Sequence, residues 1–271
     1  FNVLLLQRKH QLDNFKLGLG CEIYLLNREE VEQLKKDNEY IKFYHLVMLP
    51  KDFIGYRQLA KISTKGWLNS FYYRSLERTP VYKDDLKEII GNEKGHLVVT
   101  SACLGSEFAT YVTGFLTSKN CGLLKQAKIY KEKIIKFLSD MVELFGEDFY
   151  IELQPNHGSE QIEYNKFALE LAKGFGIKAI IATDAHYHRL NYKNTHTYFL
   201  RSQNAERETE SFYSSTYMMT VEEIRGYFDY LEETDFEWLI SNTIEIGNKI
   251  QDIDLYKPTQ VPDATIGFDE E

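Results

Sequence analysis

The chain has 271 residues, of which 43% are hydrophobic and 27% charged, with 16 glycines and 5 prolines. This composition excludes a disordered or collagen-like protein and suits one large domain or two small ones. Against 41 Asp and Glu residues stand 32 Lys and Arg residues, a net charge of −9, so no global basic field holds a nucleic-acid backbone. Any nucleic acid is therefore expected to be bound locally.

The cysteines and the apolar runs bear on location. Cys21, Cys103 and Cys121 are too few and too irregularly spaced for a disulfide framework or a paired CxxC zinc site, which favours a reducing, cytoplasmic compartment. The apolar runs are much shorter than a membrane span, so no membrane partner is expected. Segment 1–6 is apolar but has neither a basic leader nor an initiating methionine. We therefore expect a processed, truncated or incompletely represented chain.

Short runs of branched and aromatic residues alternate with longer helical patterns. Strands are predicted over 2–6, 19–26, 43–49, 96–102, 149–154 and 179–183. Apolar residues at helical spacing predict helices over about 123–145, ended by Gly146, and over 160–175, ended by Gly174 and Gly176. This alternation is typical of an α/β domain with a largely parallel sheet or barrel.

The pattern changes after about residue 215. Thr220 and Glu223 have the spacing of a capping box, which predicts a helix start, and a second helix is expected over about 236–250. The tail from Gln251 contains two of the five prolines and ends in acidic residues, as a linker to a further domain would. We therefore expect one domain over 1–212 and a helical connector over 213–271.

Polar residues that follow apolar runs are the first candidates for chemistry, because ligands gather at the carboxyl ends of strands in parallel α/β architectures. Asp184 and His186 directly follow the apolar run 178–182. They are two residues apart in an extended segment, so their side chains point to one face and can reach a common metal ion. The alternative is that Asp184 caps a turn and His186 is merely polar.

Three further residues interrupt or follow apolar runs. Glu22 lies inside a predicted strand, where a carboxylate is costly unless it is paired or binds a metal; alternatively, this strand faces water at alternate positions. His45 interrupts the run 44–49, where a lone histidine is more often a hydrogen-bonded core residue than a ligand. Cys103 follows the run 96–102, and its alternative role is that of a small buried hydrophobic residue.

His157 and His188 are weaker candidates, for positions behind the metal ligands. His157 follows the strand predicted over 149–154, but the surrounding Pro-Asn-His-Gly turn also explains its polarity. His188, like His196, lies on the segment after Asp184 and His186. The sequence contains no P-loop, GxGxxG or GxSxG motif, so it gives no basis for a phosphate-cradling loop or a serine hydrolase.

In their order, these motifs resemble the PHP (polymerase and histidinol phosphatase) domain. The matching segments are Gly-Cys-Glu at 20–22, Tyr-His-Leu at 44–46, Thr-Ser-Ala-Cys-Leu-Gly at 100–105, Phe-Tyr-Ile-Glu-Leu-Gln at 149–154, Asn-His-Gly at 156–158 and Ala-Thr-Asp-Ala-His-Tyr at 182–187. The stretches 45–67, 71–74 and 213–228 are more narrowly similar to the PHP domain at the N-terminus of bacterial DNA polymerase III alpha subunits. The resemblance covers about residues 18–262, nearly the whole chain.

The resemblance implies a distorted (β/α)7 PHP barrel that holds up to three metal ions at the carboxyl ends of its strands. The residues at matching ligand positions are Glu22, His45, Cys103, Asp184 and His186. This mixed set of oxygen, nitrogen and sulfur ligands suits Zn or Mn, and the cysteine favours Zn. In the family, metal-activated water hydrolyses phosphodiesters, and members with a complete site act as 3′ to 5′ exonucleases that can proofread.

The sequence departs from the family pattern near its start. The first strand of the family carries a His-x-His motif, followed by an acidic ligand and a Thr-Asp-His segment. Residues 1–17 contain no His-x-His, and His10 does not replace it. Either these segments are absent and the site holds fewer ions, or they belong to the protein and a gap falls at the junction of Leu6 and Gln7.

The resemblance implies a fragment of a replicative DNA polymerase that contacts DNA through the rest of the polymerase, with the nucleotidyltransferase site beyond Glu271. The five matching ligand positions favour a metal-dependent phosphoesterase or exonuclease. The missing His-x-His favours a structural module that docks other replicase subunits, such as a proofreading exonuclease. A free-standing PHP phosphatase is a third alternative, but the polymerase-like stretch after Tyr213 argues against it.

Overall fold

A computed structural model describes residues 16–91, 93–203 and 212–255. The strands are β1 (Cys21–Leu26), β2 (Tyr44–Pro50), β3 (Phe71–Tyr73), β4 (Leu76–Arg78), β5 (Pro80–Tyr82), β6 (Leu97–Thr100), β7 (Phe149–Leu153) and β8 (Lys178–Ile181). The helices are α2 (Arg28–Lys36), α3 (Phe53–Leu68), α4 (Lys83–Ile90), α5 (Glu107–Asn120), α6 (Leu124–Phe145), α7 (Ser159–Phe175), α8 (Lys193–Gln203), α9 (Val221–Tyr227) and α10 (Glu233–Lys249).

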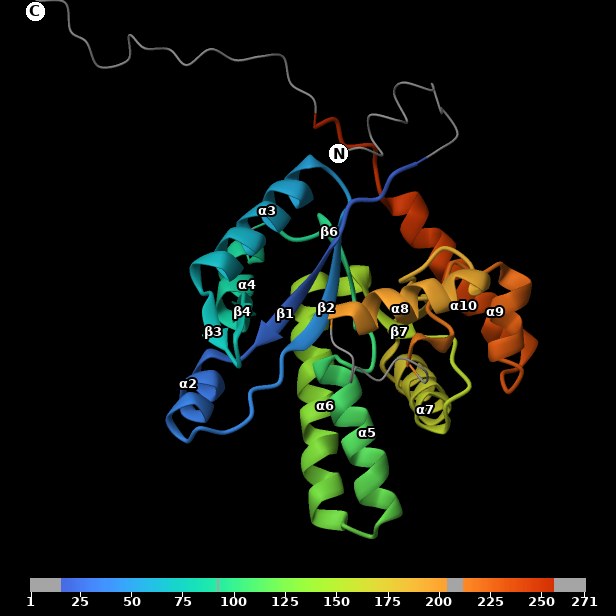
Figure 1. The fold of residues 1–271 in the computed structure, drawn as a ribbon, viewed down its shortest axis with the longest axis horizontal. Coiled ribbons are helices and arrows are strands. Elements are labelled where there is room, and N and C mark those ends of the chain that lie inside the picture. Colours follow the sequence, from blue (N-terminus) through green and yellow to red (C-terminus); the bar gives the residue numbers. More distant parts are fainter. Residues whose placement is uncertain (1–15, 92, 204–211, 256–271) are drawn as a thin grey trace, which may run out of the picture.

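A six-stranded sheet in the order β5-β1-β2-β6-β7-β8 organises the fold (Figure 1). Strand β2 pairs antiparallel with β1 and β6, and the other neighbouring strands pair in parallel. This reversal brings the start of β2 beside the carboxyl end of β6, where His45 forms an isolated bridge with Ser106. His45 therefore lies at the same edge of the sheet as the loop that follows β6.

One face of the sheet packs on the main hydrophobic core. Ile23 of β1, Leu46 of β2 and Val99 of β6 are buried there, together with apolar residues of α3 to α7. Because successive residues of a strand point to opposite faces, the neighbours of these core residues point away from the core. The sequence alternation thus separates an apolar face from a second face that carries polar side chains.

Helix α10 covers part of that second face. Ile246 of α10 and Ile250 just after it pack with Val98, Tyr150 and Ile180 of β6, β7 and β8. Further residues of the segment after 213 belong to the main core, namely Phe228, Phe236 and Leu239. The described part of the segment predicted as a connector therefore packs directly on the sheet.

Side-chain caps begin four of the helices. Asn27, Asp52, Ser106 and Thr220 each accept a hydrogen bond from a backbone N–H in the first turn of α2, α3, α5 and α9. Each cap satisfies a donor that the start of a helix leaves without an intrahelical partner. At the other end of α7, Gly176 has a φ of 67°, a left-handed conformation that glycine adopts without steric cost.

The central elements agree with the sequence prediction. The strands predicted over 19–26, 43–49, 96–102, 149–154 and 179–183 are β1, β2, β6, β7 and β8, and the helices predicted over 123–145 and 160–175 are α6 and α7. The predicted capping box of Thr220 and Glu223 is present at the start of α9, and α10 begins at Glu233, before its predicted start. The expected mixed α/β fold with a parallel-rich sheet is confirmed, and the strand predicted over 2–6 lies outside the described residues.

The structure also contains elements that the sequence did not predict: helices α2 to α5 and α8, strand β5 and the β3–β4 hairpin. In the described part of the chain, no helix combines the length and the apolar character that a bilayer crossing requires.

Candidate functional site

Glu22 of β1 and His45 of β2 meet on the face of the sheet that points away from the main core. In the antiparallel register Tyr24 is opposite His45, and Glu22 lies two residues from Tyr24, so the three side chains share this face. The distance between Nδ1 of His45 and Oε1 of Glu22 is 3.0 Å. The hydrogen bond with His45 lowers the pKa of Glu22, because it stabilises the carboxylate.

Cys103 reaches His45 from the loop that follows β6. Its Sγ lies 3.4 Å from Nδ1 of His45 and accepts a hydrogen bond from the backbone N–H of Gly105 at 3.3 Å. A Cβ atom on Gly105 would lie 3.2 Å from the same Nδ1, so glycine permits the close approach of this loop. Hydrogen bonds with Cys103 and then Glu22 raise the pKa of His45 to about 10, because both stabilise the imidazolium.

Two residues in the loops of the site have a left-handed backbone. The φ angle is 57° at Ala102, immediately before Cys103, and 45° at Asp184. Residues other than glycine adopt this region at a cost in free energy, and such strain concentrates at functional sites. The folded structure therefore holds the loops after β6 and β8 in conformations that their sequences do not favour on their own.

Asp184 and His186 follow β8. Nδ1 of His186 lies 2.6 Å from the backbone oxygen of Asp184 and 3.7 Å from Oδ1 of the same residue. A proton on Nδ1, donated to that carbonyl, places the acceptor lone pair on Nε2, as in histidines that ligate metals. The ring of His186 also packs against His196 of α8, with ring centroids 5.9 Å apart, and against Tyr213, with centroids 5.2 Å apart.

A buried carboxyl group on β7, which the sequence did not single out, interacts electrostatically with Asp184 and Glu22. Glu152 is 5% exposed, and its oxygens accept hydrogen bonds from Oγ1 of Thr100 at 2.6 Å and Nε2 of Gln154 at 3.0 Å. Burial raises the pKa of Glu152, while these two hydrogen bonds oppose the rise and the nearby charges of Asp184 and Glu22 add to it. The sequence pattern that could have identified Glu152 is the one that identified Glu22, namely a carboxylate inside an apolar strand.

Electrostatic coupling joins the two halves of the cluster. Burial raises the pKa of Asp184; His186 and His45 oppose this rise, and the charge of Glu22 adds to it. The charge of His186 in turn helps to lower the pKa of Glu22. The five predicted ligand residues, Glu22, His45, Cys103, Asp184 and His186, come from β1, β2 and the loops after β6 and β8. They form two contact groups that interact electrostatically, and together they are called the polar cluster below.

The two weaker candidates lie elsewhere. His157 is exposed and stacks on Tyr227 of α9, with ring centroids 4.3 Å apart. His188 is exposed, and its ring centroid lies 6.2 Å from that of Tyr192. His196 of α8, which lies on the same segment of the sequence as His188, packs on His186 instead.

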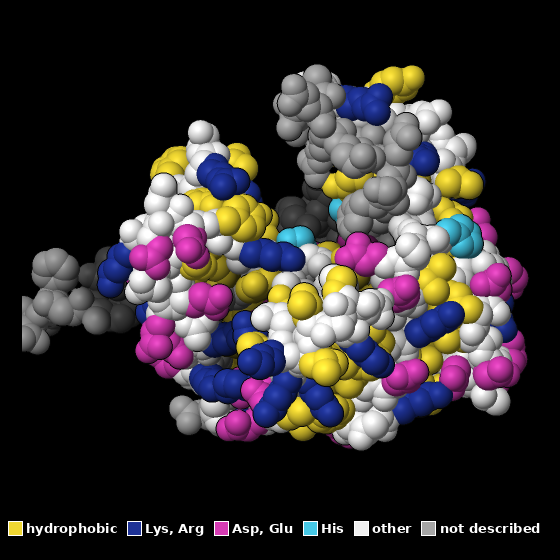
Figure 2. Space-filling view, turned by 90° about the horizontal axis from the view of Figure 1, so that it is seen from below, with side chains coloured by type: hydrophobic (Ala, Val, Ile, Leu, Met, Phe, Trp, Pro, Cys, Tyr) yellow, Lys and Arg dark blue, Asp and Glu magenta, His cyan; other side chains and the backbone are white. Residues whose placement is uncertain are grey.

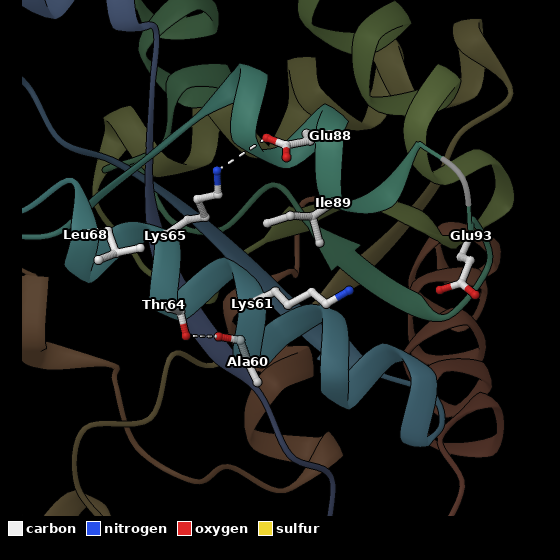
Figure 3. Close-up of a pocket in the computed structure, with 8 residues that line it drawn as sticks. All are labelled: Ala60, Lys61, Thr64, Lys65, Leu68, Glu88, Ile89 and Glu93. Carbon is white, nitrogen blue, oxygen red and sulfur yellow. Dashed lines mark hydrogen bonds and ion pairs between the residues drawn. The ribbon is translucent and has the colours of Figure 1, made fainter. Parts of the chain in front are cut away.

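A groove between α3 and α4 is separate from the cluster. It has a volume of about 880 Å³, and Lys65 and Glu88 form an ion pair at 3.4 Å on its wall (Figure 3). None of the five predicted ligands lines this groove.

The polar cluster has the donor chemistry of a zinc or manganese site, with carboxylate, imidazole and thiol groups. Within residues 16–91, 93–203 and 212–255, however, no three His, Cys, Asp or Glu side chains converge in a way that could hold an ion. Nδ1 of His45 is instead shared between Glu22 and Cys103. The donors therefore fit a metal in kind, but ligation would require these side chains to adjust or a donor from outside the described residues.

Comparison with known proteins adds independent findings. The chain is 36% identical over 251 residues to the probable DNA polymerase YorL of Bacillus subtilis (strain 168) and to the DNA-directed DNA polymerase of Bacillus phage SPbeta, covering 92% of this chain and 19% of each relative. It is 27% identical over 243 residues to the DNA polymerase III subunit alpha of Thermus aquaticus, covering 88% of this chain and 18% of that relative. The chain spans about a fifth of the length of these curated relatives.

The family comparison agrees with the fold and with the order of the motifs. The family model of the PHP domain matches residues 4–156, which include β1, β2, β6 and β7 and therefore Glu22, His45 and Cys103. Together with the parallel-rich α/β sheet, this match establishes that the chain belongs to the PHP domain family.

Proposed function

We propose that this chain is the PHP region of a replicative DNA polymerase of the polymerase III alpha type, and that its polar cluster binds a divalent metal ion and hydrolyses phosphoesters. The observation that carries the proposal is the meeting of Glu22, His45 and Cys103 around one imidazole nitrogen, beside Asp184 and His186. In this proposal the domain is a distorted (β/α)7 barrel. It works in the cytoplasm, while nucleotidyl transfer and most contacts with DNA belong to other regions of the polymerase.

The described residues have distinct tasks in this mechanism. A bound Zn or Mn ion supplies Lewis-acid activation of water and of the phosphoryl group. Asp184 and His186 would hold the ion from the loop after β8, with Nε2 of His186 oriented by the hydrogen bond of its Nδ1. Glu22 and Cys103 would hold it from the other side, and His45 would lose its proton on ligation. Behind these ligands, burial raises the pKa of Glu152.

Metal content tests the proposal directly. We expect the purified protein to contain zinc or manganese by inductively coupled plasma mass spectrometry, and we expect Asp184→Ala and His186→Ala to lose it. His188→Ala is the matched control, because His188 is an exposed histidine two residues from His186 and outside the cluster. The same variants would be assayed for hydrolysis of bis(p-nitrophenyl) phosphate, which needs no DNA. Equal metal content in all four proteins would reject the site.

A second function is favoured by a specific observation. Within the described residues, no three His, Cys, Asp or Glu side chains converge in a way that could hold an ion. A PHP domain with such a site would serve as a structural module that docks other replicase subunits, such as a proofreading exonuclease. Absence of metal and of hydrolysis in a protein that unfolds cooperatively would favour this function over the first.

A further inference from the structure

A row of aromatic rings leads from the surface beside the β3–β4 hairpin to the polar cluster. This aromatic row consists of Tyr40, Tyr73, Phe43, Tyr24 and His45. Neighbouring ring centroids along it are 6.5, 5.7, 5.6 and 5.6 Å apart in that order. Because His45 also contacts Glu22 and Cys103, the row ends at the candidate site.

Two arginines lie over these rings. The guanidinium of Arg74 is 4.9 Å from the ring centroid of Tyr40, and that of Arg78 is 5.1 Å from Phe43 and 5.8 Å from Tyr24. Within the described residues neither arginine forms an ion pair with a carboxylate, and the buried Nε of Arg78 has no hydrogen-bond partner there. Their charge is therefore balanced by aromatic faces, and in Arg78 also by a hydrogen bond that Nη1 donates to the hydroxyl of Tyr24 at 3.5 Å.

The two faces of the β3–β4 hairpin carry different charged residues. The register places Phe71 opposite Arg78 and Tyr72 opposite Glu77. Side chains alternate along a strand, so Tyr73 lies on the face of Arg78 and the aromatic row, whereas Tyr72 and Glu77 lie on the other face. The acidic residue of the hairpin is thus kept away from the row.

The hairpin turn is strained. Its two central residues, Arg74 and Ser75, have φ angles of 47° and 67°, in a turn where Asn-Gly is the favoured pair. Backbone strain of this kind persists where surrounding structure or function requires it. Here it places a guanidinium over Tyr40, which is 62% exposed.

The inner end of the row also has a packing role. Tyr24, Phe43 and Tyr73 pack partly against a small core that includes Ile41. This core explains why these three rings are half-buried, but it does not require the exposed ring of Tyr40 or the unpaired charges of Arg74 and Arg78. Core packing therefore does not account for the outer part of the row, which is the part where a ligand could bind.

We propose that the aromatic row with Arg74 and Arg78 is a binding track for single-stranded nucleic acid that leads one end of the strand to the polar cluster. Unpaired bases stack on exposed aromatic rings, and guanidinium groups bind the phosphates between them. A duplex hides its base faces, so it would lose this contact. The proposal rests on the proposed function only for the end point of the strand, because binding along the track requires no metal.

The side of the molecule that carries the track has side chains of mixed character. Figure 2 shows Lys, Arg and hydrophobic side chains on the lobe at its left, together with Asp and Glu side chains, and a histidine at the foot of that lobe. The left side of the molecule carries α2 and the β3–β4 hairpin in Figure 1. Since the protein as a whole has a net charge of −9, a strand would have to be held by a local feature of this kind.

Fluorescence anisotropy with a labelled oligothymidylate of about 12 nucleotides tests the track, with EDTA present so that metal binding and hydrolysis play no part. We expect Tyr40→Ala to weaken binding about 5-fold or more, as the loss of one stacked base does. The matched control is Tyr72→Ala, since Tyr72 is 77% exposed on the other face of the hairpin, and its affinity should be unchanged.

A second pair of variants tests the charges. Arg74→Ala should weaken binding and reduce the slope of log affinity against log salt by about 0.7, the value for one phosphate contact with a single strand. Arg57→Ala, which removes an exposed arginine from α3, should change neither quantity. Circular dichroism of each variant would verify that the fold is retained.

Three outcomes would overturn the track: no binding of the oligonucleotide, equal losses in Tyr40→Ala and Tyr72→Ala, or duplex DNA bound as tightly as the single strand. Equal losses would indicate a nonspecific effect or a different surface. Binding through Tyr40 and Arg74 in a protein that holds no metal would support the track and reject only the hydrolytic function.

Discussion

Glu152 is a buried carboxyl group, and its surroundings disfavour the charged form. Burial raises its pKa above the value in the unfolded chain, so the folded state binds the proton more tightly. Where the folded state binds more protons, the free energy of unfolding falls as the pH rises. We expect Glu152→Gln to remove this decline, so that the variant gains stability relative to the native protein between about pH 4 and pH 7. Urea unfolding across this range measures the difference.

Glu163→Gln is the control for this prediction, because Glu163 is an exposed carboxylate on α7. Its difference from the native protein should stay constant over the same pH range. A native protein that loses no more stability than Glu152→Gln on the way to neutral pH would contradict the assignment of Glu152 as a buried carboxyl group with a raised pKa.

At the residue scale, the sequence was informative where a strand ends. Asp184, His186 and Cys103 follow β8 and β6, and the rule that polar groups collect at the carboxyl edge of a parallel sheet selects them. His45 lies at the start of β2, so only the reversal of that strand, which periodicity does not reveal, brings it to the same edge. Glu152 was missed because it lies inside a strand that is buried along its whole length.

At the element scale, helix α10 is attached to the sheet by an ion-pair network around Glu245. Its carboxylate lies 2.6 Å from Nζ of Lys178 and 3.0 Å from Nζ of Lys249, and it accepts a hydrogen bond from the hydroxyl of Tyr150 at 2.9 Å. Lys249 also reaches Asp148 at 2.9 Å. These contacts join α10 to β7, to β8 and to the turn before β7.

The network predicts a specific loss of stability in acid. Contact with Lys178, and then with Lys249 and Tyr150, lowers the pKa of Glu245 to about 2 from 4.5. A carboxyl group whose pKa is lower in the folded state stabilises the protein above its unfolded pKa, and this contribution is lost as the pH falls from about 4.5 to 2. We expect Glu245→Gln to lower stability at neutral pH by on the order of 1 kcal/mol, and to flatten this acid limb in thermal unfolding.

Glu237→Gln provides the control within the same helix, because Glu237 is an exposed residue of α10. It should leave stability at neutral pH within about 0.5 kcal/mol of the native value and keep the acid limb. If Glu237→Gln and Glu245→Gln were equally stable at every pH, the network would have no role in fixing α10.

Three of the helices that the sequence did not predict, α2, α3 and α5, lack a regular apolar stripe. Only Val31 is buried in α2, so this helix has no apolar stripe. The buried face of α3 includes Gly55, Gln58 and Gly66, and that of α5 includes Glu107 and Ser118, which breaks the apolar period in both helices. Helices α6 and α7 were predictable because their buried residues repeat at helical spacing.

At the scale of the whole molecule, the segment after residue 213 shares the core of the sheet. Phe228 and Leu239 are fully buried in the main core, and Phe236 is nearly so. Ile246 and Ile250 cover the opposite face of β6, β7 and β8. Residues of this segment thus belong both to the main core and to the cluster on the second face of the sheet. Composition had marked a change of character near residue 215, but composition does not reveal which surfaces are in contact.

Ending the chain at residue 212 should therefore abolish cooperative folding. Burial of each large apolar side chain is worth about 1.5 to 3 kcal/mol, so five of them together contribute about as much as the whole stability of a typical domain, about 5 to 15 kcal/mol. We expect the shortened chain to bind the dye ANS and to lose its sharp thermal transition, whereas a chain ended at residue 255 keeps it. A shortened chain with an unchanged transition would mean that residues 213–255 form an independent connector, because the sheet would then be stable without their cover.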